Sequence, residues 1–379
     1  MTTAPIALRS LCAGQLAFYR HQGYEVIAIA NPGEDLDVVA SLEGVRTMAV
    51  PMQREIRPLA DVVSLWRLCR LFRRLRPEIV TTATAKASLL GLLAARLSGV
   101  PARIYQLWGL RLETTHGLKR RILKIAEWIT VACAHRVICV SDSLRREYIA
   151  CHCAPLEKTV VLLNGSSNGV DASRFTQTSA VKSAAENLRA QWQIAGADPV
   201  IGFVGRFVHD KGIVNLIDAF DEVLKSRPDA WLLLVGDYES GDPVPDAYVH
   251  RIATHPRIIR TGFIRDLAPY YGVMSVLALP TYREGFPNVV LEAGAAELPV
   301  VAFRATGAVD AVQDNVTGAL VEIGDSHGLA SALLRYLNDE ERRRCHGQAA
   351  RQRVLRDFSR EQIWEALDSQ FREVLAQAK

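Results

Sequence analysis

Residues 200–220 have the sequence VIGFVGRFVHDKGIVNLIDAF, in which a short apolar run precedes a polar loop and an amphipathic stretch. The run at 200–204 is apolar and rich in β-branched residues, as expected of a strand buried on both faces. From Ile213 to Phe220, apolar residues recur at the spacing of one helix face. The segment therefore predicts a strand, a loop that carries Arg206 and Lys211, and the start of a helix.

Short runs of the same kind recur along the chain, separated by helical patterns. They lie at residues 26–30, 79–82, 103–107, 137–140, 160–163, 200–204, 231–235, 258–261, 276–279, 300–303 and 319–323. Strands that alternate with helices predict βαβ units, and hence an α/β fold with parallel sheets covered by helices on both faces.

The length of 379 residues exceeds what one hydrophobic core usually supports, so we expect two domains. The strand pattern lapses at 164–199, where we expect a linker that includes a polar helical stretch. We predict two doubly wound, Rossmann-like domains, residues 1–170 and 171–379, facing a cleft at the carboxyl ends of their strands. The terminal helical segment, about residues 355–379, could pack back on the first domain.

Composition excludes several classes of protein. With 49% hydrophobic and 23% charged residues, the chain is neither disordered nor fibrous. Its apolar runs are shorter than the roughly 18 residues of a membrane span, so no transmembrane helix is expected. The amino terminus lacks the basic residues that begin a secretory signal, so no signal peptide is expected either. The 7 cysteines lack framework spacing, and Cys151-His152-Cys153 lacks a second ligand pair, so we expect reduced thiols and no zinc site.

Charge is distributed unevenly. Residues 1–180 carry a net charge of +9 and residues 181–379 carry −5, which points to an anionic partner for the first half; a solvated basic face is the alternative. In a helix at 65–76, Leu68 and Phe72 would face the core, whereas Trp66 falls among arginines. With the basic residues at 119–124, this pattern favours an anionic membrane surface. Nucleic acid is not expected, because no recognised binding module is present.

Two loops carry residues suited to a phosphorylated ligand. Arg206 and Lys211 flank a predicted helix amino terminus, which favours a phosphate or diphosphate; a solvated turn is the alternative. The chain lacks the phosphate-loop and dinucleotide fingerprints. Residues 280–293, PTYREGFPNVVLEA, follow another predicted strand, with Pro287 suited to the first helical turn.

That second loop offers amide donors between two carboxylates. The N–H groups of Gly285, Phe286 and Asn288 would suit phosphate oxygens, and Glu284 and Glu292 would suit sugar hydroxyls. A bare helix start with an acidic first turn is the alternative. We therefore expect a site for a sugar attached to a diphosphate.

These residues, with Glu284 and Glu292 in an E-x7-E pattern, resemble the donor site of retaining GT-B glycosyltransferases of family 4. Motifs in the first half resemble the capsular and O-antigen branch of that family: residues 51–58, 84–86, 105–111, 117–120 and 164–171. The resemblance covers nearly the whole chain. One departure is Ala85, where the family motif often has proline.

The resemblance implies a role for each matched residue. Arg206 and Lys211 would hold the donor diphosphate, Glu284 would contact the donor sugar and Glu292 the ribose. The remaining implied donor-site residues are Gly205, Gly285, Phe286, Pro287 and Asn288. Lys86 and Arg111 match positions of the first domain that could bind the acceptor phosphate, or the donor from the opposite side.

The resemblance also implies an activity: transfer of a sugar, an N-acetylated hexosamine, from a UDP-sugar to a polyprenyl-diphosphate-linked saccharide during capsule, O-antigen or exopolysaccharide assembly. The donor's α configuration would be retained, either by front-face attack or by double displacement with a nucleophile such as Glu284. The enzyme would be cytoplasmic and peripheral at the inner face of the plasma membrane. The alternatives are a sugar-nucleotide epimerase of the same architecture and a non-catalytic sugar-nucleotide-binding protein.

We expect neither a metal ion nor another cofactor, because the two cations and the amide dipoles would stabilise the leaving diphosphate. Asp35-Leu36-Asp37 has the form of a metal-placing DxD motif, but it lies at a predicted helix start, where a capping role is expected.

The amino terminus departs from the family pattern. Residues 1–5, MTTAP, stand where a hydrophobic first strand would already be ending. Because the first strand of a doubly wound domain lies centrally in the sheet, we expect a gap there, with Met1 a late start or the chain less stable than its length suggests.

Overall fold

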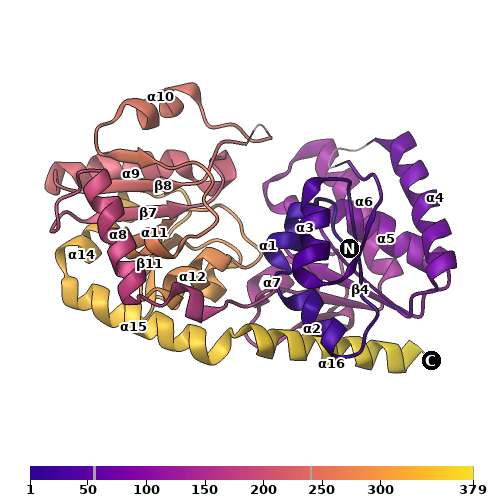
Figure 1. The fold of residues 1–379 in the computed structure, drawn as a ribbon. Helices are drawn as coiled ribbons and strands as arrows, with labels where there is room; N and C mark the ends of the chain where they lie inside the picture. Colours follow the sequence, from indigo (N-terminus) through magenta and orange to yellow (C-terminus); the bar gives the residue numbers. More distant parts are fainter. Residues whose placement is uncertain (54–56, 240, 379) are drawn as a thin grey trace. The chain divides into compact units, whose positions relative to one another are not determined.

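The computed structural model describes residues 1–53, 57–239 and 241–378. Two compact units make up the chain: Met1–Gly169 with Arg360–Lys379, and Val170–Ser359. The chain passes from the first unit to the second one residue before the end of the expected first domain, and residues from Arg360 onward belong to the first unit. Parallel sheets covered by helices in both units confirm the predicted α/β class (Figure 1).

The first unit is built on two parallel sheets. Its strands are β1 (Ile27–Ala30), β2 (Arg46–Ala49), β3 (Ile79–Ala83), β4 (Ala102–Leu107), β5 (Arg136–Cys139) and β6 (Thr159–Val161), ordered β1-β2 and β3-β4-β5-β6. Its helices are α1 (Pro5–Leu11), α2 (Gln15–His21), α3 (Glu34–Glu43), α4 (Pro58–Leu75), α5 (Ala85–Leu97), α6 (Gly117–Cys133), α7 (Asp142–Ala150) and α16 (Arg360–Ala378). The strand β2 escaped prediction because its end residues Arg46 and Ala49 are exposed.

Helices cover both faces of the first unit's larger sheet. On one face, Leu68 and Phe72 of α4 pack with Val80 of β3, which confirms that the apolar face of this arginine-rich helix is core. On the other face, Leu367 of α16 packs with Ile104 of β4. The terminal helix α16 lies beside α2 in this unit (Figure 1). None of the described helices combines the length and the apolar character that crossing a bilayer requires.

Residues 1–3 lie between the two sheets of the first unit. The Met1 ammonium donates to the Thr81 carbonyl at 2.9 Å and the Ala83 N–H to the Met1 carbonyl at 2.9 Å, so Met1 pairs with β3. On the opposite side, the Thr2 N–H donates to the Ile29 carbonyl of β1 at 3.0 Å. These residues therefore occupy only the carboxyl end of a position between β1 and β3, and α1 begins at Pro5.

A cavity of about 180 Å³ lies at the amino end of that position. Met1, Ile27 and Ile79 are among its lining residues. Tyr19 and Thr82 also line it, and their buried hydroxyls have no hydrogen-bond partner within the described ranges. Burial lowers the pKa of the Met1 ammonium, because an apolar environment disfavours its charge. The gap expected between the neighbouring strands is therefore present as a cavity.

The second unit contains a six-stranded parallel sheet. Its strands are β7 (Val200–Val204), β8 (Trp231–Val235), β9 (Ile258–Arg260), β10 (Val276–Leu279), β11 (Val300–Phe303) and β12 (Gly318–Val321), in the order β12-β11-β10-β7-β8-β9. Its helices are α8 (Ser179–Gln191), α9 (Ile213–Ser226), α10 (Asp246–Thr254), α11 (Ala268–Val273), α12 (Asn288–Ala295), α13 (Ala308–Ala311), α14 (Ser326–Asn338) and α15 (Glu340–Asp357). Leu216 and Phe220 of α9 and Leu333 of α14 pack with the sheet in one buried cluster.

The stretch 164–199, expected as a linker, is largely part of the second unit. It includes α8, which packs against α11 and buries Ala185. The expected polar helical stretch is present, but its assignment to a linker was wrong, because α8 packs into the second unit with one side.

Candidate functional site

Two loops meet at the carboxyl edge of the second unit's sheet. They follow β7 and β10, which are parallel neighbours. A short 3-10 helix, η4 (His209–Lys211), leads into α9 through Gly212, whose φ of 67° is left-handed. A Cβ atom at Gly212 would lie 1.8 Å from the Pro280 carbonyl oxygen, so glycine is required for this close approach. The approach brings Lys211 beside the loop after β10.

Lys211 forms an ion pair with Glu284, and both side chains are largely buried. The Glu284 N–H donates to the Thr306 carbonyl at 3.1 Å, which fixes the backbone of this loop. Two residues 73 positions apart, each predicted separately for the site, are thus in direct contact.

Arg206 pairs with Glu239, which lies beyond the end of β8. Because β8 is the other neighbour of β7, its following segment reaches the same edge of the sheet. Glu239 was not predicted, since nothing in its local sequence distinguishes it from an ordinary surface acid. Gly205, beside Arg206, donates its N–H to the Val235 carbonyl at 3.0 Å, so this N–H extends the hydrogen bonding between β7 and β8.

The helix α12 begins at Asn288, with Pro287 at the N-cap position and not, as expected, inside the first turn. The ring of Phe286 packs 5.3 Å from that of Phe358, so its side chain serves the core and only its backbone is suited to a ligand. The side-chain oxygen Oδ1 of Asn288 is buried and has no hydrogen-bond partner among the residues described. Such an oxygen is suited to accept from a ligand hydroxyl.

Glu292 lies one turn inside α12 and accepts a hydrogen bond from Tyr271 on α11. The Tyr271 hydroxyl donates to Oε2 of Glu292 at 2.8 Å, and the tyrosine is buried. Burial, reinforced by the neighbouring carboxylate, raises the pKa of Tyr271 well above its usual value, so the hydroxyl remains a donor. Sequence inspection missed Tyr271, because the two residues are 21 positions apart on different helices.

One group in the described part of the chain has the composition of a metal site: His209, Asp210 and Asp242. Oδ2 of Asp242 accepts the Asp210 N–H at 2.7 Å, and the Asp210 carboxylate pairs with Arg283 at 2.6 Å. Both carboxylates therefore hold the loops of the site together.

Asp35 and Asp37 lie in the first turn of α3, where a carboxylate favours the helix dipole. The N-cap is Gly33, with no side-chain cap, so the expected capping role was wrong in detail. Asp35 pairs with Arg9 at 2.7 Å.

The two candidates of the first unit lie just beyond neighbouring strands. Lys86, in the first turn of α5 after β3, places Nζ 2.7 Å from both carboxylate oxygens of Asp61 on α4. Arg111 begins the 3-10 helix η1 (Arg111–Thr114) after β4. Because β3 and β4 are parallel, both residues lie at the carboxyl edge of this sheet. Of the motif at 51–58, residues 54–56 lie outside the described residues.

Two family models match the chain. Residues 9–165 match the glycosyl transferase 4-like domain, and residues 198–339 match glycosyl transferases group 1. The chain is 34% identical over 370 residues to the capsular polysaccharide biosynthesis glycosyltransferase CapM of Staphylococcus aureus, covering 97% of this chain and 95% of CapM.

More distant similarities also lie among glycosyltransferases and proteins of the same fold. The chain is 26% identical to the Escherichia coli UDP-Gal:alpha-D-GlcNAc-diphosphoundecaprenol alpha-1,3-galactosyltransferase, over 79% of this chain and 76% of that enzyme. The crystal structure of Anabaena HepE in complex with UDP superimposes with a TM-score of 0.79 at 20% identity, covering 98% of both chains, which shows the shared fold. The chain therefore belongs to the group 1 glycosyltransferases and is an enzyme of the GT-B fold, related to a glycosyltransferase of bacterial capsular polysaccharide biosynthesis.

Proposed function

We propose that the enzyme transfers a sugar, an N-acetylated hexosamine, from a UDP-sugar to a polyprenyl-diphosphate-linked saccharide, with retention of the donor's α configuration. The observation that carries this proposal is the arrangement of Lys211, Glu284 and Glu292 around one edge of the second unit's sheet. Ligands of doubly wound sheets bind at this edge. The related galactosyltransferase, by its name, uses UDP-galactose and a diphosphoundecaprenol-linked acceptor.

The reaction requires stabilisation of a leaving diphosphate. The bond between the anomeric carbon and the diphosphate oxygen breaks, and negative charge develops on that oxygen. Arg206, Lys211 and the amino terminus of α12 would stabilise this charge. In front-face transfer, the acceptor hydroxyl forms the new bond on the same side of the sugar and gives its proton to the departing diphosphate.

Both cations are already paired with carboxylates, which has a consequence for donor binding. Arg206 contacts Glu239 and Lys211 contacts Glu284. A bound diphosphate would take the place of Glu239 at Arg206, whereas Glu284 would remain beside Lys211 and accept from a sugar hydroxyl. Glu292, oriented by Tyr271, would accept from the ribose hydroxyls.

We place the acceptor diphosphate at Lys86 and Arg111 in the first unit, and the reaction at the inner face of the plasma membrane. Asp61 orients Lys86, so that the ammonium is held at the carboxyl edge of the sheet. On the outer side of α4, Trp66 is 59% exposed and the Arg70 guanidinium lies 5.7 Å from its ring centre. These groups, with the basic residues of α6, suit an anionic lipid surface.

The direct test offers the enzyme a panel of nucleotide sugars with a short-chain polyprenyl-diphosphate saccharide, and identifies products by mass. We expect one sugar to be added to the acceptor from a UDP donor, and the same product to be nearly absent with Lys211→Ala. Conversion of a nucleotide sugar without an acceptor product would favour the epimerase. Binding of a nucleotide sugar without any conversion would favour the non-catalytic alternative.

Chelation is expected to leave most of the transferase activity intact, because Arg206 and Lys211 would supply the positive charge at the diphosphate. Initial rates before and after treatment with EDTA, with magnesium or manganese added back, measure this. Loss of activity that a metal ion restores would contradict the prediction and direct attention to Asp210 and Asp242.

Tyr271→Phe is expected to raise KM for the donor about tenfold with little change in kcat, since the loss of a hydrogen bond to a charged group costs roughly 1.5 kcal/mol. Tyr270→Phe, on the same helix with its ring against Trp192, is the matched control. A lower kcat at unchanged KM would assign Tyr271 to the chemical step instead. Equal KM values for both variants would show that Glu292 needs no such support.

A further inference from the structure

The outer surface of α6 in the first unit is unusually apolar for a helix exposed to solvent. Its exposed apolar residues are Leu118 (72%), Ile122 (43%), Ile125 (58%), Trp128 (59%) and Ile129 (40%). Their spacing of three or four residues places them along one stripe, about 16 Å long at 1.5 Å per residue. Contiguous exposed apolar surface of this kind marks an interaction site.

The charges of α6 show what partner its surface suits. Lys119, Arg120 and Arg121 are exposed in its first turns, and Lys124 follows them. The helix has one acidic residue, Glu127, which is buried and accepts from the Tyr148 hydroxyl at 2.6 Å. The exposed surface therefore combines apolar side chains with cations alone, which is complementary to anionic lipid and unfavourable for a basic partner.

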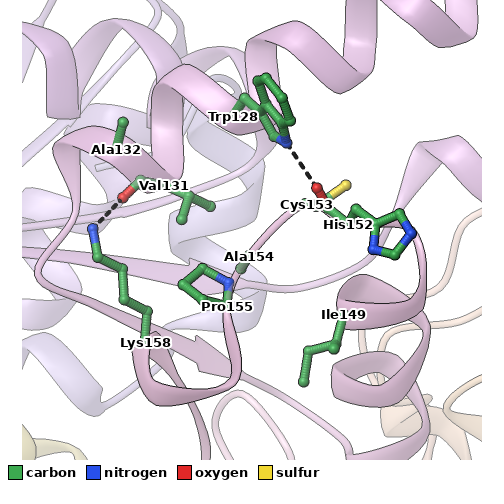
Figure 2. Close-up of a pocket in the computed structure, with 9 residues that line it drawn as sticks. All are labelled: Trp128, Val131, Ala132, Ile149, His152, Cys153, Ala154, Pro155 and Lys158. Atoms are coloured by element: carbon green, nitrogen blue, oxygen red, sulfur yellow. Dashed lines mark hydrogen bonds between the residues drawn. The ribbon is translucent and has the colours of Figure 1, made fainter.

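A pocket continues the apolar surface at the carboxyl end of α6. Its volume is about 600 Å³, and Trp128, Val131, Ile149 and Pro155 contribute apolar walls (Figure 2). The indole N–H of Trp128 donates to the His152 carbonyl at 2.7 Å, which holds the ring at the pocket. Lys158 donates to the Val131 carbonyl at 3.0 Å, so its ammonium provides a hydrogen-bond partner for a carbonyl group in the last turn of α6 (Figure 2).

We propose that α6 is the membrane-inserting element of this enzyme. Its apolar stripe enters the interfacial region of an anionic bilayer, its cations contact lipid head groups, and the pocket beside Trp128 receives part of a lipid chain. The inference rests on the proposed function, in which the acceptor is anchored in the membrane and the enzyme must bind the membrane surface to reach it. In this proposal α6 inserts into the bilayer, whereas the exposed arginines of α4 only attract the enzyme to the anionic membrane surface.

Tryptophan fluorescence separates α6 from α4, because Trp66 and Trp128 report on the two helices. With vesicles of phosphatidylglycerol and phosphatidylcholine that carry bromine on their acyl chains, we expect quenching of the enzyme's fluorescence. Trp128→Phe should abolish most of this quenching, whereas Trp66→Phe should preserve it. The reverse pattern would overturn the assignment to α6.

Binding measurements test the surface independently of its tryptophan. Ile125→Asp is expected to weaken partitioning onto anionic vesicles at least tenfold, whereas Leu42→Asp, at a 70% exposed position on α3, should not. Binding should weaken as salt rises, because head-group attraction is screened within about 10 Å at 0.1 M. Equal partitioning onto neutral and anionic vesicles would contradict the role of the cations.

Two further outcomes would decide against the proposal. A lipid-free dimer that Ile125→Asp dissociates would show that a second copy of the chain covers this surface. Unchanged vesicle binding by Ile125→Asp, with its melting temperature preserved, would show that α6 does not insert. Transfer to a short-chain acceptor in solution is expected to survive Ile125→Asp, so a failed membrane test and a failed transferase assay are distinguishable.

Discussion

Lys211→Ala is expected to lower kcat by about a hundredfold or more. Lys211 ends η4, directly before Gly212 and α9, and contacts Glu284, so its ammonium would face the diphosphate as charge develops on it. The loss of one donor to a developing oxyanion costs on the order of 10² to 10³ in rate. Steady-state kinetics with the preferred nucleotide sugar measure the effect, and Arg206→Ala should change the rate in the same direction.

The matched control is Lys225→Ala, which removes an exposed lysine from the last turn of α9, the helix that follows η4. Melting temperatures of both variants show whether lost activity reflects lost folding. Glu284→Gln separates the lysine's effect from that of its partner, since it keeps the ammonium in place. Near-normal turnover by a folded Lys211→Ala enzyme would disprove the proposed donor site.

Fusing an extended segment of about six apolar, β-branched residues before Met1 is expected to raise the melting temperature by on the order of 10 °C. The segment would pair with β1 and β3 and fill the cavity of about 180 Å³ that lies between them. At roughly 24 cal/mol per Å³, filling this cavity contributes about 4 kcal/mol, and each kcal/mol shifts a domain of this size by roughly 2 to 4 °C.

The fusion also replaces the buried Met1 ammonium with a neutral peptide group. Burial lowers the pKa of this ammonium in the folded chain, so at a pH below about 8 the unfolded chain binds more protons than the folded chain does. The unmodified chain therefore gains stability as the pH rises over that range, and its difference from the fused chain should narrow. A glycine-serine segment of equal length is the control, and equal melting temperatures for both fusions would show that no strand enters the cavity.

Local sequence was sufficient for most of the fold. The strands β7, β8, β10 and β11 lie where their apolar runs predict them, because a strand buried on both faces must be apolar along its length. The strand β2 lacks that signal, since it is only partly buried. The helical pattern of α8 was visible, but its polar surface concealed its packing, because local composition does not reveal a one-sided contact.

In the candidate site, too, local sequence predicted some features and tertiary packing decided others. Lys211, Glu284 and Glu292 could be predicted because each follows a strand or begins a helix, and these local positions bring cations, carboxylates and amides to one sheet edge. Only the tertiary structure decided which groups touch: Glu239 lies 33 residues from Arg206, and Tyr271 reaches Glu292 from another helix. Such contacts depend on the order of strands in the sheet and on how helices pack against it, and neither is encoded in the spacing of residues along the chain.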